Sequence, residues 1–223
     1  TAGGMIAGYT VNDSNVFNNP ESYEVEIEIL PNIEPFDINK SSLKKTIKTV
    51  LSGIQETNYP ISQSEKSLCL GNYLNLLSGK NPSKEITEEI TRLNNGISSK
   101  SFIGPSSVTL QHENVVPLND YTNVININKD YSVTDKADGI RKLLYINHVG
   151  KMYLIDTNMK VQFTGMVTET KELFNSILDG EHIIYNKHKQ FANLYAAFDV
   201  YFINGIDIRS RPLIGKDDKT RYS

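Results

Sequence analysis

The sequence predicts an α+β protein in which a helical region precedes an antiparallel sheet. Two observations support this fold class. Between residues 41 and 96, apolar residues recur at spacings of three and four, as they do on one face of a helix. From residue 101 onward, short β-rich runs are separated by turn residues, which is typical of antiparallel strands.

Three helices are predicted in the first of these regions. The first begins at Ser41 or Ser42, either of which can cap it. The second ends near Gly79, and the third runs from Ser83 to the Asn-Asn-Gly sequence at 94–96. No residue pattern here indicates chemistry, so we interpret the region as a packing module or connector.

The second region is predicted to contain many short strands and one helix. A hairpin is expected at 142–155, with its turn near 147–150. The predicted helix covers about 167–175. The predicted strands cover residues 107–110, 131–135, 142–147, 152–156, 177–178, 182–185 and 195–203.

Composition and charge describe an ordinary globular protein of 223 residues, 39% hydrophobic and 22% charged, with a net charge of -3. That charge argues against coating nucleic acid through bulk charge, but it leaves room for a local basic groove. Cys69 is the single cysteine, which excludes a disulfide within the chain. With no secretory signal and no long apolar run, we expect a cytoplasmic protein without a membrane partner. The four histidines lack the spacing of a zinc site.

An acidic segment near the start, Glu21–Leu30, alternates charged and apolar residues. This period of two predicts a strand with Val25, Ile27 and Ile29 on one face. On the other face, three glutamates repel one another unless cations lie between them. An exposed acidic strand and a cation site are both open at this point. The three glutamates are Glu24, Glu26 and Glu28.

The sharpest motif is Lys-x-Asp-Gly-x-Arg, formed by Lys136, Asp138, Gly139 and Arg141. A lysine amine is a nucleophile only when it is neutral, so such a site must lower its pKa by burial or by neighbouring positive charge. Gly139 allows the backbone to turn. Arg141 suits a ribose edge or a phosphate. A strand that ends in a polar turn explains the same residues equally well.

Two downstream segments favour the functional interpretation. An apolar strand ends in Asp179-Gly180-Glu181, which is either a β-turn or a carboxylate placed to bond a ribose hydroxyl or hold a metal ion. A later apolar strand contains Phe198, whose ring could stack on a purine.

Taken in order, these pieces resemble the covalent nucleotidyltransferase superfamily, which contains mRNA guanylyltransferases and the ATP-dependent DNA and RNA ligases. The resemblance covers about residues 101–212 and is greatest for the capping enzymes of large nucleocytoplasmic DNA viruses. It implies an antiparallel-sheet nucleotidyltransferase core that is ATP-grasp-like and truncated. The matching pieces are Phe-x-Gly-Pro-x-x-Val-Thr-Leu at 102–110, Asp-Tyr-x-Val-x-x-Lys-x-Asp-Gly-x-Arg at 130–141, Leu-Asp-Gly-Glu at 178–181 and Phe-Asp at 198–199.

The resemblance implies a role for each matching residue. Lys136 forms the phosphoamide bond to the nucleotide, and Asp138 and Gly139 complete its motif. Arg141 contacts the ribose, and Glu181 matches the glutamate of the third motif. Phe198 matches the aromatic residue that stacks on the base.

The resemblance also implies three domains. Residues 1–32 would end an RNA triphosphatase domain, with Glu24, Glu26 and Glu28 on a strand of a triphosphate-tunnel β-barrel that binds divalent metal. Residues 33–100 would be a helical connector. Residues 101–223 would be the nucleotidyltransferase domain, incomplete at its C-terminus because the family's Lys-x-Lys motif and oligonucleotide-binding lid are missing.

The implied activity is transfer of GMP from GTP, through lysyl-GMP, to the 5′ diphosphate end of RNA, with Mg²⁺ or Mn²⁺. GTP, the RNA 5′ end and a cap methyltransferase domain or subunit are the implied partners. One alternative is an ATP-dependent ligase that uses the same lysine chemistry. A non-catalytic binding module of this fold is the other. The nucleotide that labels the protein would distinguish among them.

Overall fold

The computed structural model describes residues 10, 24–28, 40–117, 124–215 and 220–221. The chain divides into two compact units, Thr1–Val50 and Leu51–Ser223, and the second of them contains every described strand. Helix α1, Lys40–Gln55, crosses the division and confirms the first predicted helix. No helix among the described residues is long and apolar enough to span a bilayer.

The described part of the predicted acidic strand, residues 24–28, has no regular secondary structure, and its side chains are exposed. The prediction of a strand is therefore wrong for these five residues, while the rest of Glu21–Leu30 lies outside the described residues. An alternating sequence is not sufficient for a strand, because the backbone must also find a hydrogen-bonding neighbour. Among the described strands, none pairs with 24–28.

Two further helices follow the predicted pattern. Helix α2, Gln63–Leu77, begins at Ser62, whose hydroxyl accepts a hydrogen bond from the Glu65 amide at 3.1 Å. Helix α3 spans Glu88–Asn95 and is capped by Thr87, so it begins later than Ser83, where it was predicted to start. The Ser83 hydroxyl instead donates to the Glu85 carbonyl at 2.7 Å and accepts from the Glu85 amide at 3.4 Å, so it closes the turn that precedes the helix.

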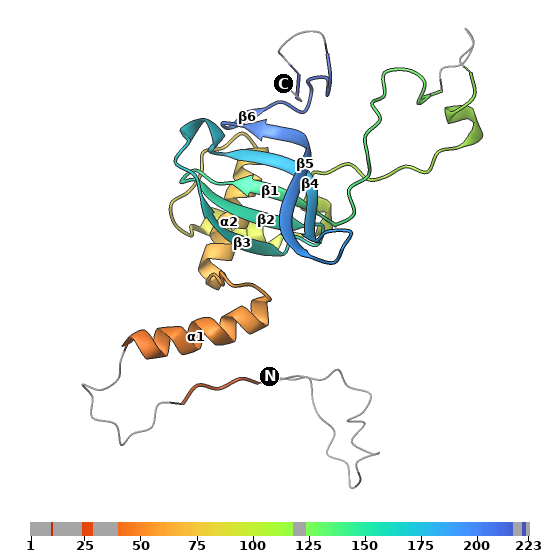
Figure 1. Ribbon diagram of the computed structural model, residues 1–223. Coiled ribbons are helices and arrows are strands. Elements are labelled where there is room, and N and C mark those ends of the chain that lie inside the picture. Colours follow the sequence, from red (N-terminus) through yellow and green to blue (C-terminus); the bar gives the residue numbers. More distant parts are fainter. Residues whose placement is uncertain (1–9, 11–23, 29–39, 118–123, 216–219, 222–223) are drawn as a thin grey trace. The chain divides into compact units, whose positions relative to one another are not determined.

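Six antiparallel strands form one sheet in the order β3-β2-β1-β4-β5-β6 (Figure 1). The predicted hairpin at 142–155 is confirmed as β1 and β2. Short 3₁₀ turns lie at Ser99–Ser101, His112–Asn114 and Lys171–Leu173. The strands are β1 Ile140–Ile146, β2 Lys151–Asp156, β3 Val161–Val167, β4 Ser176–Tyr185, β5 Phe191–Ile203 and β6 Ile206–Asp207.

Several strand predictions need correction. Residues 107–110 and 131–135 form no strand, since no other described segment pairs with them. The predicted strands at 177–178 and 182–185 are a single strand, β4. The predicted helix at 167–175 contains only the one 3₁₀ turn. Strands β3 and β6 were not predicted. Gly165, which has a φ of 82°, lies within β3 where its pairing with β2 shifts register.

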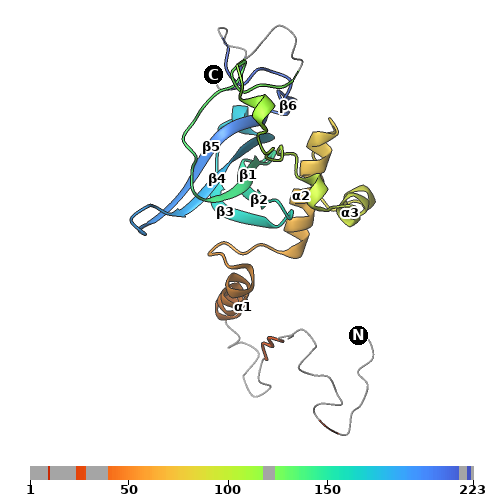
Figure 2. The same ribbon diagram turned by 90° about the vertical axis from the view of Figure 1, so that its right-hand side faces the viewer.

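The hydrophobic core is formed by side chains of α2 and of one face of the sheet. Figures 1 and 2 together show α2 lying against the sheet. The Tyr73 ring of α2 meets the Tyr145 ring of β1 edge to face, with centroids 6.2 Å apart. The Tyr73 hydroxyl also donates to the Ser101 carbonyl at 2.8 Å. The predicted boundary between residues 100 and 101 therefore runs through one core, in which α2 covers the sheet.

Candidate nucleotide-binding site

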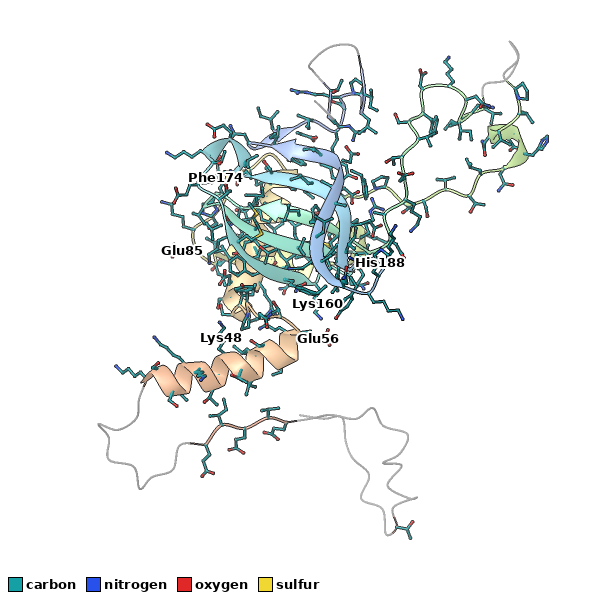
Figure 3. The ribbon with its side chains drawn as sticks, viewed as in Figure 1. Lys48, Glu56, Glu85, Lys160, Phe174 and His188 are labelled. Carbon is teal, nitrogen blue, oxygen red and sulfur yellow. The ribbon has the colours of Figure 1, made fainter. Side chains whose placement is uncertain are left out.

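The Lys-x-Asp-Gly-x-Arg motif enters the sheet at the start of β1. Antiparallel pairing places this end of β1 beside the β2–β3 and β4–β5 turns. Figure 3 shows Lys160 and His188, from these two turns, at the same end of the sheet and Phe174 at the opposite end. The predicted site residues after the motif come from β4 and β5.

Lys136 lies on an exposed segment, residues 131–138, that has no regular secondary structure. Its Nζ donates a hydrogen bond to the neighbouring Ala137 carbonyl at 3.3 Å. The described residues supply no hydrogen bond or ion pair between this amine and Arg141 or Glu181. The structure thus presents the amine to solvent near the start of β1.

Gly139 is required for a different reason from the one predicted. It is not among the glycines with positive φ. A Cβ at this position would instead lie 2.7 Å from the His182 carbonyl oxygen, which is backbone and cannot move aside easily. The motif segment therefore passes directly against β4, and glycine allows that approach.

Arg141 is held by a fork-to-fork ion pair with Asp179 on the adjacent strand. Its Nε donates to Asp179 Oδ1 at 3.1 Å, and its Nη2 donates to Oδ2 at 2.5 Å. Asp179 is fully buried, and it also accepts a hydrogen bond from the Tyr201 hydroxyl at 2.5 Å. Two-point geometry and burial make this a strong, orienting pair. The bond to Asp179 raises the pKa of Arg141, so the guanidinium stays charged.

The Phe-x-Gly-Pro segment lies against the other side of the same guanidinium. Arg141 Nη1 donates to the Pro105 carbonyl at 2.6 Å. The Phe102 ring lies 5.4 Å from the guanidinium carbon, a cation–π contact. Gly104 has no room for a side chain, because a Cβ would be 2.4 Å from that ring and 2.5 Å from Nη2.

Glu181 is the cross-strand partner of Arg141, so the two residues lie side by side on one face. Its Oε2 atom is buried and has no hydrogen-bond partner among the described residues. A buried carboxylate oxygen without a donor is costly. A ligand hydroxyl or a cation at this position would satisfy it.

Phe198 belongs to β5, at an irregularity in its pairing with β4 between Asp179 and Gly180. The residue is 42% exposed, so it is accessible to a ligand. The next residue, Asp199, pairs with Asp179 across the strands, and each of these like charges has its own arginine. Arg221 Nη1 donates to Asp199 Oδ2 at 2.7 Å.

The structure brings Arg141 and Glu181 together and leaves Lys136 and Asp138 on the exposed segment before them. Sequence reasoning missed the roles of Asp179 and Tyr201. Asp179 was visible within Leu-Asp-Gly-Glu, but Asp-Gly was weighed as a turn, whereas here it lies inside β4. A glycine follows Asp179 because the Tyr195 ring lies over that position, only 2.6 Å from where a Cβ would be.

Lys142, next to Arg141 on β1, is a second lysine to consider. It points to the opposite face, where its Nζ donates to Gln162 Oε1 at 3.0 Å. Burial lowers its pKa, opposed by the nearby Asp156 carboxylate. Its orientation away from Arg141 and Glu181 separates it from the candidate site.

Metal-binding residues are not gathered in the described part of the chain, where no group of three or more histidine, cysteine, aspartate or glutamate side chains converges. Glu24, Glu26 and Glu28 lie exposed on their irregular segment. Their role as metal ligands stays a prediction. A cavity of about 680 Å³ lies elsewhere, between α2 and the β1–β2 turn, and none of the predicted site residues lines it.

Comparison with known proteins identifies a family for the part of the chain that contains the motifs. The family described as mRNA capping enzyme, catalytic domain, matches residues 72–217, which include every predicted site residue from Lys136 to Phe198. A probable mRNA-capping enzyme of Acanthamoeba polyphaga mimivirus is 32% identical over 191 residues, 85% of this chain. The chain spans 13% of the length of that relative. The matched region covers well over half of the sequence, and the chain belongs to the mRNA capping enzyme catalytic domain family.

Proposed function

We propose that this chain carries the guanylyltransferase step of mRNA capping, with Lys136 as the nucleophile. The observation that carries the proposal is the cross-strand pair Arg141–Glu181, immediately after the Lys-x-Asp-Gly sequence. It combines a fixed cation with a carboxylate oxygen that has no donor among the described residues. The cation is complementary to a phosphate group of a nucleotide, and the carboxylate oxygen is complementary to a hydroxyl group.

The reaction has two steps, and each step forms one bond and breaks one. The deprotonated Lys136 amine attacks the α-phosphorus of GTP, an N–P bond forms, and the bond to the pyrophosphate oxygen breaks. The amine loses its second proton to solvent, and pyrophosphate leaves with the bonding electron pair. A terminal phosphate oxygen of the 5′ diphosphate RNA end then attacks the same phosphorus and forms an O–P bond. The N–P bond breaks, the Lys136 nitrogen takes up a proton from solvent, and GMP is joined to the RNA.

The chain's own residues supply position and charge. Glu181 accepts a hydrogen bond from a ribose hydroxyl, and Phe198 offers its exposed ring to the base. Arg141 faces the sugar or phosphate edge. A divalent ion such as Mg²⁺ or Mn²⁺ accompanies GTP and offsets its phosphate charge. These contributions are typical of phosphoryl transfer, in which enzymes act mainly by positioning and electrostatics.

Covalent labelling of the full-length protein with α-³²P GTP tests the proposal. We expect wild type to take up label that survives denaturation and alkali but is lost in hot acid, as a P–N bond is. Pyrophosphate added to the native labelled protein should release the label. Lys136→Ala should lose the label, whereas Lys142→Gln should keep it. Label that persists in Lys136→Ala would overturn the assignment, whether or not Lys142→Gln keeps its label.

The choice of nucleotide separates capping from ligation. The same experiment with α-³²P ATP should give little label, because the proposal assigns guanine to the base position beside Phe198. Stronger labelling by ATP than by GTP would identify a polynucleotide ligase with the same lysine chemistry. A complete lack of label from both nucleotides would favour a non-catalytic domain.

We also propose that Glu24, Glu26 and Glu28 belong to an RNA 5′-triphosphatase site whose other residues lie elsewhere in the full-length protein. The support is their spacing of two, which repeats three carboxylates within five residues. Changing all three to Gln should abolish metal-dependent release of the RNA γ-phosphate and leave GMP labelling intact. Unchanged γ-phosphate release would refute this part of the proposal.

A further inference from the structure

The guanidinium of Arg141 is fixed on three sides and leaves two donors unused. Its Nε and one N–H of Nη2 go to Asp179, and one N–H of Nη1 goes to the Pro105 carbonyl. An arginine carries five N–H donors. Within the described ranges, no acceptor bonds the remaining N–H of Nη1 or that of Nη2. The Arg141 side chain is 28% exposed, so those two donors can reach a ligand.

Tyr201 bonds the same carboxylate that holds the guanidinium, and it also helps to raise the pKa of Arg141. Its hydroxyl donates to Oδ2, the same oxygen that Arg141 Nη2 bonds. Tyr201 is buried on β5, two residues after Asp199, and Asp179 lies on the neighbouring strand. Burial first, and then the bond to Asp179, raise the pKa of Tyr201, so the phenol keeps the proton that it donates. The carboxylate therefore cannot rotate without breaking bonds to two strands.

The segment 102–105 completes the enclosure from the chain that precedes the motif. It contributes the Phe102 ring face and the Pro105 carbonyl, and the missing side chain of Gly104 leaves the space that the guanidinium fills. We name Asp179, Tyr201 and residues 102–105 the Arg141 brace. Its parts are separated widely in sequence, yet all of them act on one side chain.

We propose that the Arg141 brace positions the two unused N–H donors of Arg141 for the bound nucleotide, and that Tyr201 is a positioning residue for GTP binding. This inference rests on the proposed nucleotide site. It follows from the geometry that a rigid planar donor pair costs less to immobilise than a free arginine, whose side chain loses more conformational entropy on binding. The brace thus acts on the affinity for GTP rather than on the attack by Lys136.

The test measures GTP binding by calorimetry in a Lys136→Ala background of the full-length protein, where no covalent reaction interferes. Adding Tyr201→Phe should raise the Kd for GTP roughly fivefold to tenfold, which corresponds to about 1 to 1.4 kcal/mol. This is less than the full value of a hydrogen bond to a charged group, because the lost bond lies within the protein and the Arg141–Asp179 pair remains. Tyr145→Phe is the matched control. It removes another buried tyrosine hydroxyl, one without a hydrogen-bond partner among the described residues, and should leave the Kd unchanged.

A double-mutant cycle separates positioning from general stability. If Tyr201 acts through Arg141, then Tyr201→Phe should add little to the Kd once Arg141→Lys has removed the fork. Additive effects of Tyr201→Phe and Arg141→Lys on the Kd would contradict the proposed role of the Arg141 brace. Equal effects of Tyr201→Phe and Tyr145→Phe would contradict it too. In protein that keeps Lys136, Tyr201→Phe should raise the KM for GTP and change kcat little.

Two further outcomes remain distinguishable. If Tyr201→Phe fails to fold, Gly104→Ala tests the same brace from the partly exposed segment. Its Cβ would push Arg141 aside, and GTP binding should weaken again; unchanged binding would overturn the inference. If the Lys136→Ala protein binds no GTP at all, the proposed nucleotide site fails. If it binds GTP but is indifferent to Tyr201→Phe, the brace alone fails.

Discussion

The candidate site joins two unlike regions, the strands β1, β4 and β5 and the irregular segment 131–138. On the strands, Arg141 is fixed by three hydrogen bonds and a stacked ring. On the segment, Lys136 is exposed and bonds only the carbonyl of its neighbour among the described residues. Under the proposed function, the fold pre-organises the nucleotide contacts, whereas Lys136 takes its final position with the substrate complex.

Among the substitutions that test this difference between the two regions, the one at Asp179 should have the largest effect, and that effect is on the free energy of unfolding. Asp179→Ala should lower the free energy of unfolding by about 3 kcal/mol, because it leaves the Arg141 guanidinium and the Tyr201 hydroxyl without their shared acceptor. Asp207→Ala removes the exposed partner of Arg209 and should cost less than about 1 kcal/mol. Urea unfolding of both variants measures the difference. Similar losses would show that burial does not distinguish the two pairs.

A smaller effect is expected where the two regions meet, at Gly139. Gly139→Ala places a Cβ against the His182 carbonyl and should reduce GMP labelling by about tenfold, which corresponds to about 1.4 kcal/mol. Gly53→Ala is the control, since nothing lies within 4 Å of a Cβ there. That change should leave labelling intact and stabilise α1 by up to about 1 kcal/mol. Normal labelling in Gly139→Ala would mean that the segment adjusts without cost.

The smallest expected effect is on the pH dependence of folding stability, to which two aspartates that both pair with arginine contribute with opposite signs. Burial raises the pKa of Asp199, so the folded state binds more protons and stability falls as pH rises past the ordinary aspartate value of about 3.9. The hydrogen bond from Arg209 lowers the pKa of Asp207, so its contribution is present above that value and is lost as pH falls.

Urea unfolding midpoints measured at pH values around the ordinary aspartate pKa of about 3.9 check the two predicted directions of stability change. Asp199→Asn should remove a decline of stability with rising pH, and Asp207→Asn should remove a rise. The second change should be slight, because the Asp207 side chain is 45% exposed and solvent screens its pair. Slopes that change in the same direction for both variants would contradict the assigned directions.

Local patterns in the sequence predicted the parts of the fold that local physics decides. The spacing of apolar residues placed α1 and α2, and turn residues at 147–150 placed the β1–β2 hairpin. The Lys-x-Asp-Gly-x-Arg and Leu-Asp-Gly-Glu sequences located residues that register then sets side by side, Arg141 and Glu181.

What could not be predicted depends on contacts between distant segments. The alternation at 24–28 and at 131–135 looks like strand, but pairing is decided by a neighbour that the pattern does not contain. Asp179 is 38 residues from Arg141 in the chain, so nothing local marks it as the acceptor. The Phe-x-Gly-Pro sequence, which reads only as a turn before a strand, proves to enclose the same arginine.

The position of α2 bears on how this protein can be dissected for laboratory work. A fragment cut at residue 101 would keep every motif residue but would remove the helix that covers Tyr145, Tyr153 and Ile155. Such an uncovered apolar face favours aggregation. Recombinant expression of the motif-bearing part should therefore start upstream of Ser62, so that the capped helix is retained whole.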